Sequence, residues 1–202
     1  MPKSTYEDLV LSLAERLGSI RARDLAGEGI PTVILSRMVA SGRLERSTRG
    51  IYTLPEAATS EHRPLIDLSL RVPSAVVCLL SALRHYQIGT QSPRDVWLAI
   101  PSSLSSPRVS YPRVRYVWMS PASLSAGVEE AVLDGVSVRI FAPAKTVADC
   151  FKFRNKLGLD VAIDALTDSW RKGLVSMPDL WHFAKIDRVA NVMRPYLETL
   201  ST

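Results

Sequence analysis

The stretch that decides the fold is residues 19–55, SIRARDLAGEGIPTVILSRMVASGRLERSTRGIYTLP. Two short helical patterns come first, one over residues 22–27 and one that begins at Pro31 and ends at Gly42. Two strand patterns follow, 44–46 and 51–54, around a basic turn at 47–50. Helix, turn, helix and basic-tipped hairpin, in this order, predict a winged helix-turn-helix.

The second helix has two different faces. At 100° per residue, Ile34, Leu35, Met38 and Val39 share one face, which we expect to be buried. The opposite face carries small, hydroxylated and basic side chains, which suit close approach to a groove of DNA. Adding the arginines of the hairpin, the predicted DNA-binding residues are Thr32, Val33, Ser36, Arg37, Arg43, Arg46 and Arg49. Two alternatives stay open, namely a small helical domain with a hairpin and a winged helix that binds protein.

The segment before this stretch predicts one more helix. Ser4 and Glu7 have the spacing of a capping box, and apolar residues then recur at helical spacing until Gly18. This helix would complete a three-helix core. We therefore expect a winged-helix domain at residues 1–55, a polar linker at 56–64 and a second domain at 65–202.

The second domain alternates helical and strand patterns. We expect a helix from Ser74 to near Gly89, strands at 96–100 and 114–119, and a hairpin of 130–133 and 136–141 around Asp134-Gly135. Helices should follow at 143–151, from 159 to Gly173, at 178–185 and at 188–200. The predicted fold class is α+β, with a small, mainly antiparallel sheet and several helices in the second domain.

Composition sets broad limits on function. The chain has 202 residues, of which 47% are hydrophobic, so a packed core is expected. Its net charge of +5 favours polyanionic partners without requiring them. Cys78 and Cys150 lie in apolar helical patterns and are expected to be buried thiols. No apolar targeting segment or bilayer-spanning run occurs, and we expect a cytoplasmic protein.

The sequence offers little chemistry for catalysis. It has no phosphate-binding loop and no nucleophile elbow, and its three histidines lie in different predicted elements. Asp160, Asp164 and Asp168 recur every four residues along one helix. A solvated face, or one that meets a basic partner, explains this stripe better than a metal site. We expect no metal, no cofactor and no enzymatic activity.

Three motifs in order carry a family resemblance. They are Arg49-Gly50-Ile51-Tyr52 after the helix-turn-helix, residues 80–83 running into 88–90 and 93–101, and Ala142-Pro143-Ala144-Lys145-Thr146-Val147-Ala148-Asp149-Cys150. Together they resemble the AbiEi-type antitoxins of type IV toxin-antitoxin systems over nearly the whole chain. Lys145 departs from the arginine more usual before Thr-Val-x-Asp, and lysine does not replace arginine at a bidentate site.

The resemblance implies two tasks. The winged helix would bind inverted repeats in the promoter of its own operon, as two copies or a dimer, and act as a repressor. The second domain would counter a nucleotidyltransferase-like toxin encoded next to it, directly or indirectly. Gly18-Ser19 is not followed by paired aspartates, so this chain does not carry the motif of such a toxin.

Two basic sets in the second domain are candidates for the antitoxin surface. One is Arg108, Arg113 and Arg115, interleaved with Tyr111, Tyr116 and Trp118; the other is Lys145, Lys152, Arg154 and Lys156. Alternatively, the aromatic residues belong to the core and the charges to a solvated rim. Two other functions also stay open, a transcription regulator whose second domain binds a small ligand or protein, and an enzyme with an appended DNA-binding domain.

Overall fold

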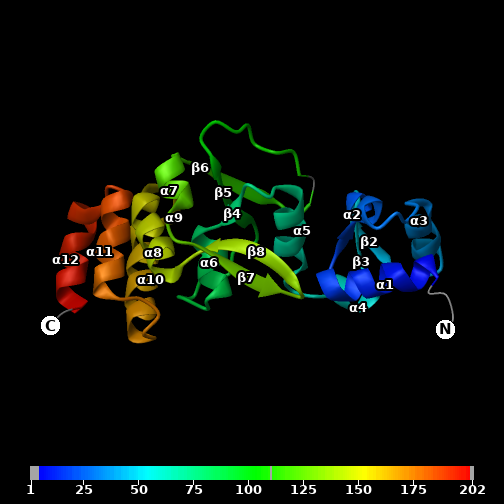
Figure 1. Ribbon diagram of the computed structural model, residues 1–202. Helices are drawn as coiled ribbons and strands as arrows, with labels where there is room; N and C mark the ends of the chain where they lie inside the picture. The colour runs from blue at the N-terminus through cyan, green and yellow to red at the C-terminus, as the bar shows by residue number, and fades with distance from the viewer. Residues whose placement is uncertain (1–4, 110, 201–202) are drawn as a thin grey trace. The chain divides into compact units, whose positions relative to one another are not determined.

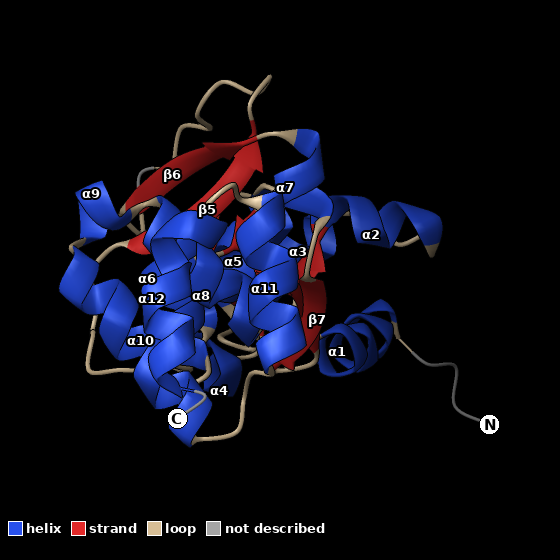
Figure 2. Ribbon diagram, turned by 90° about the vertical axis from the view of Figure 1, so that its left-hand side faces the viewer, coloured by secondary structure: helices blue, strands red, loops and turns tan. Residues whose placement is uncertain are grey.

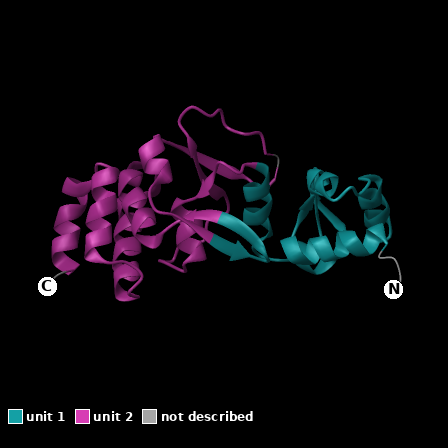
Figure 3. Ribbon diagram, viewed as in Figure 1, with its two compact units in different colours: residues 1–71, 131–138 teal, residues 72–130, 139–202 magenta. Residues whose placement is uncertain are grey.

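The structure is a computed structural model that describes residues 5–109 and 111–200. It divides into two compact units (Figure 3). The first ends at Arg71 and also includes Ala131–Val138, while the second comprises Val72–Glu130 and the chain from Arg139 onward. The first unit therefore continues sixteen residues beyond the boundary expected at residue 55.

The start of the first unit contains three helices and a small sheet (Figure 1). The sheet is antiparallel, in the order β1-β3-β2, and the two-residue strand β1 was not predicted from the sequence. The elements are α1 (Tyr6–Leu17), β1 (Ile20–Arg21), α2 (Ala22–Gly27), α3 (Val33–Ala40), β2 (Glu45–Thr48) and β3 (Ile51–Thr53). Val10, Leu25, Leu35, Met38 and Leu44 are among the buried residues of their common core.

Helix α1 begins with a capping box, although not the expected one. Thr5 Oγ1 accepts the backbone N–H of Asp8, and the Asp8 carboxylate accepts the backbone N–H of Thr5. The pair predicted from the sequence began at Ser4, which lies outside the described residues. The same three-residue spacing fits both pairs, because Thr and Asp can replace Ser and Glu in this arrangement.

Two helices occupy the segment expected to be a linker and its continuation. They are α4 (Pro55–Ala58) and α5 (Arg63–Arg71). Helix α5 packs with its apolar Ile66 and Leu68 fully buried. Pro55 and Pro64 both fall in first helical turns, where proline is tolerated, so the prolines that suggested a linker instead begin helices.

The second sheet is mixed, so the prediction of a mainly antiparallel sheet is wrong. Its order is β6-β5-β4-β8-β7; β5 pairs with β6 in parallel, β4 with β8 in parallel, and β4 with β5 antiparallel. The chain leaves β5 and returns through a long loop that lets β6 run in the same direction. The strands are β4 (Val76–Val77), β5 (Val96–Pro101), β6 (Val114–Met119), β7 (Val128–Leu133) and β8 (Val136–Phe141).

Helices α8, α10, α11 and α12 gather on one side of this sheet (Figures 1 and 2). Their core joins Val147, Phe151 and Leu166 to Trp97 and Phe141 of the strands. The helices of this region are α6 (Leu79–His85), α7 (Pro121–Ser125), α8 (Pro143–Lys152), α9 (Arg154–Leu157), α10 (Leu159–Arg171), α11 (Met177–Ile186) and α12 (Ala190–Leu200). The α+β class is confirmed.

One predicted helix is interrupted. The pattern that begins at Ser74 forms the short strand β4 before α6 starts at Leu79. Val76 and Val77 are buried and pair with strands on both sides, which β-branched residues favour.

The two cysteines are free and buried, as expected. Among the described residues, no helix is long and apolar enough to cross a membrane.

Candidate nucleic-acid interface

Helix α3 presents the two faces that its sequence predicts. Ile34, Leu35 and Met38 are buried in the core, and Val39 is half-buried. Every residue of the opposite face is exposed, including Val33, whose exposed fraction is 54%. The exposed set is Thr32, Val33, Ser36, Arg37 and Ala40. Only small side chains flank Arg37 on this face, so its guanidinium is accessible to a groove.

The hairpin of β2 and β3 has the form of a wing. Gly50 at its turn has a φ of +79°, a conformation that L side chains rarely adopt, which explains the glycine. Arg46 and Arg49 are both exposed on this hairpin. Arg43, which was also predicted to bind DNA, instead forms an ion pair with Glu7 of α1. It therefore ties α1 to the start of the hairpin and is less available to DNA than the other two.

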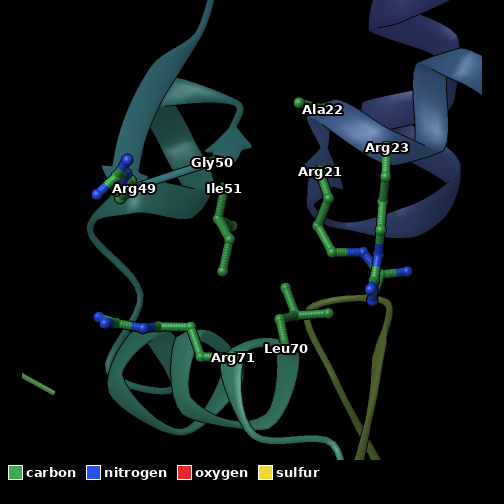
Figure 4. A pocket seen from close by; sticks show the side chains of 8 residues that line it. All are labelled: Arg21, Ala22, Arg23, Arg49, Gly50, Ile51, Leu70 and Arg71. Atoms are coloured by element: carbon green, nitrogen blue, oxygen red, sulfur yellow. The ribbon is translucent and has the colours of Figure 1, made fainter. Parts of the chain in front are cut away.

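A pocket with four arginines lies beside the wing (Figure 4). It has a volume of about 280 Å³ and combines three segments of the first unit: the junction of β1 and α2, the turn of the wing and the end of α5. We call it the arginine pocket. Its lining residues are Arg21, Ala22, Arg23, Arg49, Gly50, Ile51, Leu70 and Arg71.

Strand pairing and α5 build this pocket. Arg21 of β1 pairs with Ile51 of β3, and the Ala22 N–H donates to the Gly50 carbonyl at 3.4 Å. These bonds bring the start of α2 next to the turn of the wing. On α5, the Arg71 Nη1 donates to Thr48 Oγ1 of β2 at 3.1 Å. Sequence reasoning missed Arg21, Arg23 and Arg71, because a two-residue strand and an unpredicted helix position them.

Helix α5 is held to the sheet by buried polar groups. Arg63 Nε donates to Asp67 Oδ1 at 2.8 Å, and Arg63 Nη1 donates to Ser19 Oγ at 2.9 Å. Asp67 also accepts a hydrogen bond from Ser47 Oγ of β2. Arg63 and Asp67 are only 7% and 8% exposed, so these bonds satisfy groups that water does not reach.

In the second unit, the first basic set lies on an exposed surface. Arg113 and Arg115 flank Asp95: Arg115 Nε donates to Asp95 Oδ2 at 2.8 Å, and Arg113 Nε lies 3.3 Å from Asp95 Oδ1. Arg108 is exposed too. Of the interleaved aromatic residues, Tyr111 is 76% exposed and Trp118 48% exposed, so these two do not belong to the core.

The second basic set is not one surface, which corrects the prediction for Lys145. Lys145 is fully buried, and its ammonium lies 2.5 Å from Asp149 Oδ1 and 3.0 Å from Asp187 Oδ2. Lys152 is partly buried and pairs with Asp187 Oδ1 at 2.9 Å. Arg154 is half-buried and donates to the Phe151 carbonyl, whereas Lys156 is exposed. Lys145 lies in α8, where every residue from Ala144 to Phe151 is buried.

The pKa values of Asp149 and Asp187 in this buried network are shifted in opposite directions. Burial raises the pKa of Asp149 to about 8, against a smaller opposing effect of Lys145. Its Oδ2 is buried without a hydrogen-bond partner among the described residues, which also disfavours the ionised form. Burial alone would also raise the pKa of Asp187, but Lys145 and the hydrogen bonds from Ser123 and Lys152 lower it below its usual range.

The acidic stripe of α10 has structural partners. Asp168 accepts the Gly89 N–H at 2.8 Å and forms ion pairs with Arg171 and Lys172, and these contacts lower its pKa. Asp164 accepts the Thr90 N–H at 3.3 Å. Among the described residues, no group of three His, Cys, Asp or Glu side chains could hold a metal ion.

A family model matches part of the first unit. Residues 8–55 match the family model described as "Transcriptional regulator, AbiEi antitoxin". This segment is an AbiEi-type regulator domain. The match runs from within α1 to the end of β3 and so includes the exposed face of α3 and the wing. It confirms the AbiEi resemblance for this segment.

One solved structure supports the fold beyond the AbiEi-type domain. The crystal structure of the RV2827C protein from Mycobacterium tuberculosis superimposes with a TM-score of 0.56 at 14% sequence identity. The alignment covers 96% of this chain and 80% of that one, so the two proteins share an architecture. No curated protein matches the chain.

Proposed function

We propose that the chain is the antitoxin of a type IV toxin-antitoxin system and represses its own operon. Its winged helix would bind inverted repeats in the promoter, and its second unit would counter a nucleotidyltransferase-like toxin encoded beside it. The observation that carries the proposal is the exposed face of α3, with Arg37 at its centre, inside the segment that matches the AbiEi regulator model.

Docking on DNA follows from this geometry. The polar face of α3 would enter the major groove, where an arginine can donate two hydrogen bonds to a guanine edge. Arg46 and Arg49 on the wing would contact phosphates on the flank. One such unit covers one half-site, so an inverted repeat would bind two copies of the chain.

The antitoxin task falls to the second unit, and its exposed arginine and aromatic surface is the candidate region. We define the partner surface as Arg108, Tyr111, Arg113, Arg115 and Trp118. Trp118 Nε1 donates to the Leu104 carbonyl at 2.9 Å, which fixes the indole with about half of its surface in solvent. Exposed aromatic residues beside arginines are typical of tight protein-protein contacts. An acidic surface on the partner would complement the three arginines.

The test separates the two tasks in the full-length chain. Cells that express the neighbouring toxin would receive wild type, Arg37→Ala, or a variant with Arg113→Ala, Arg115→Ala and Trp118→Ala. We expect Arg37→Ala to weaken promoter binding about tenfold or more and still restore growth. We expect the triple variant to bind the promoter and fail to restore growth. Failure of the wild-type chain to restore growth would refute the antitoxin function. Rescue by the triple variant would refute only the assignment of the surface.

A further inference from the structure

We propose that the arginine pocket binds phosphate groups of the DNA backbone, so that the DNA interface extends past the winged helix to Arg71 at the end of α5. The inference rests on the proposed function and deepens it, because it assigns a phosphate site to residues outside the segment that matches the family.

The pocket is strongly cationic. Four of its eight lining residues are arginines, and none of the eight is acidic. Arg21 is partly neutralised by Asp24, whose carboxylate lies 3.0 Å from Arg21 Nη2. Arg71 donates to a neutral hydroxyl, that of Thr48. Among the described residues, Arg23 and Arg49 have no ion-pair partner, and both are exposed. A pocket with this excess of positive charge favours an anion, because like charges held together repel one another when no counter-charge is present.

The position of the arginines fits a chain of phosphates. In Figure 4, Arg49 and Arg71 extend on one side of the pocket and Arg21 and Arg23 lie on the other, with Ile51 and Leu70 between them. Guanidinium groups bind phosphate oxygens through paired N–H donors. Cationic groups on both sides of an apolar floor suit a backbone that crosses the pocket, with phosphates at its rims.

The lining also argues against a free nucleotide as the ligand. It contains no aromatic side chain on which a base could stack. Its polar side chains are all arginines, so the lining offers no side-chain acceptor that could recognise a base or a ribose hydroxyl. Recognition is therefore restricted to phosphate. Arg49 links the pocket to the wing, which we have proposed to follow the same DNA backbone.

Helix α5 adds to the site a positioned cation, Arg71, that the wing does not supply. Its Arg63–Asp67 pair is bonded to Ser19 and Ser47, so Arg71 is held in a fixed place on the first unit. A guanidinium that is already positioned loses less side-chain entropy on binding than a free one. The site accordingly contributes affinity that does not depend on base sequence, whereas Arg37 contributes specificity.

The test measures binding of the full-length protein to its promoter duplex and to an unrelated duplex, from 50 to 300 mM salt. We expect Arg71→Ala and Arg23→Ala each to weaken binding to both duplexes by about tenfold, and to reduce the slope of log affinity against log salt by about 0.9. Arg71→Lys should restore part of the affinity. Arg194→Ala on α12 removes the same charge from an exposed residue of the second unit and should change neither quantity.

Folding and ligand identity are controlled within the same experiment. Arg23 is exposed and makes no ion pair among the described residues, so Arg23→Ala tests the pocket even if Arg71→Ala unfolds. Unchanged affinity and salt slope in Arg23→Ala and in a folded Arg71→Ala, with promoter binding that still requires Arg37, would overturn the pocket and leave the proposed function intact. Pyrophosphate binding to wild type and to Arg23→Ala is measured as well. If wild type binds pyrophosphate, and Arg23→Ala loses this binding with unchanged DNA binding, the site belongs to a small phosphorylated ligand and the DNA assignment is overturned. No binding of the wild-type protein to its promoter would refute both.

Discussion

Lys145 Nζ lies 3.0 Å from Asp187 Oδ2, and both side chains are inaccessible to solvent. The two residues come from α8 and from the end of α11, so this ion pair joins two helices of the second unit. Ser123 Oγ donates to Asp187 Oδ1 at 2.6 Å and brings α7 into the same network. A buried ammonium is stable only while the groups that pair with it remain.

Removal of Lys145 should therefore destabilise the protein strongly. Lys145→Met keeps the length of the side chain but leaves the Asp187 carboxylate buried with one cation fewer. We expect a loss of about 3–5 kcal/mol in the free energy of unfolding, measured by urea denaturation. Lys185→Met on the exposed face of α11 is the matched control and should change stability by less than about 0.5 kcal/mol. Equal stability of the two variants would contradict the role of the buried pair.

Asp149 should make stability depend on pH. Its pKa in the folded protein is about 8, above the ordinary value of 3.8, so the unfolded chain releases this proton near pH 4 and the folded chain holds it to about pH 8. Stability from this group is complete below pH 4 and declines through that window, by about 1.4 kcal/mol per pH unit. Asp149→Asn cannot ionise and should remove this decline. Urea midpoints at pH 5, 6 and 7 measure it, and parallel profiles of wild type and variant would argue against a neutral Asp149.

Arg37→Ala should reduce specific DNA binding. A bidentate contact to a guanine discriminates by about 1–3 kcal/mol, so we expect affinity for the promoter fragment to fall about tenfold or more. Affinity for an unrelated duplex should fall much less. Arg16→Ala, which removes an exposed arginine from the last turn of α1, controls for the change in charge. A gel-shift assay in which Arg37→Ala equals wild type would show that this face of α3 does not read DNA.

The wing arginines should act through phosphates. Arg46→Ala and Arg49→Ala should each weaken binding to all duplexes alike and reduce the salt slope by about 0.9, because each lost phosphate contact releases fewer counterions. Fluorescence anisotropy over a series of salt concentrations measures this. Arg43 lies just before β2 and is paired with Glu7, so it provides a contrast, and Arg43→Ala should change the slope less. Slopes identical to wild type in Arg46→Ala and Arg49→Ala would place the wing away from DNA.

Local patterns predicted local structure well. The apolar spacing of Ile34, Leu35 and Met38 identified the buried face of α3, because one helix face is enough to define such a pattern. Asp134-Gly135 marked the turn between β7 and β8, where both residues have positive φ. The exposed residues of α3 and the wing were therefore identified from the sequence, although their contact with DNA stays a prediction.

Features that depend on distant partners were missed. In the sequence, Val76 and Val77 resemble the start of a helix. They form a strand because β5 and β8 pair on either side of them. Lys145 was expected on the surface, because a lysine among charged residues normally is, and only Asp149 and Asp187 make its burial possible. Arg71 was overlooked for a similar reason, since only Thr48 and the Arg63–Asp67 pair place it beside the wing.

The polar bonds between α5 and the small sheet have a consequence for protein engineering. A DNA-binding module excised after residue 55 would leave Ser19 and Ser47 without the Arg63 and Asp67 groups that they bond. A fusion that transplants this module to another effector should join the new partner after Arg71, where the first unit's N-terminal segment ends.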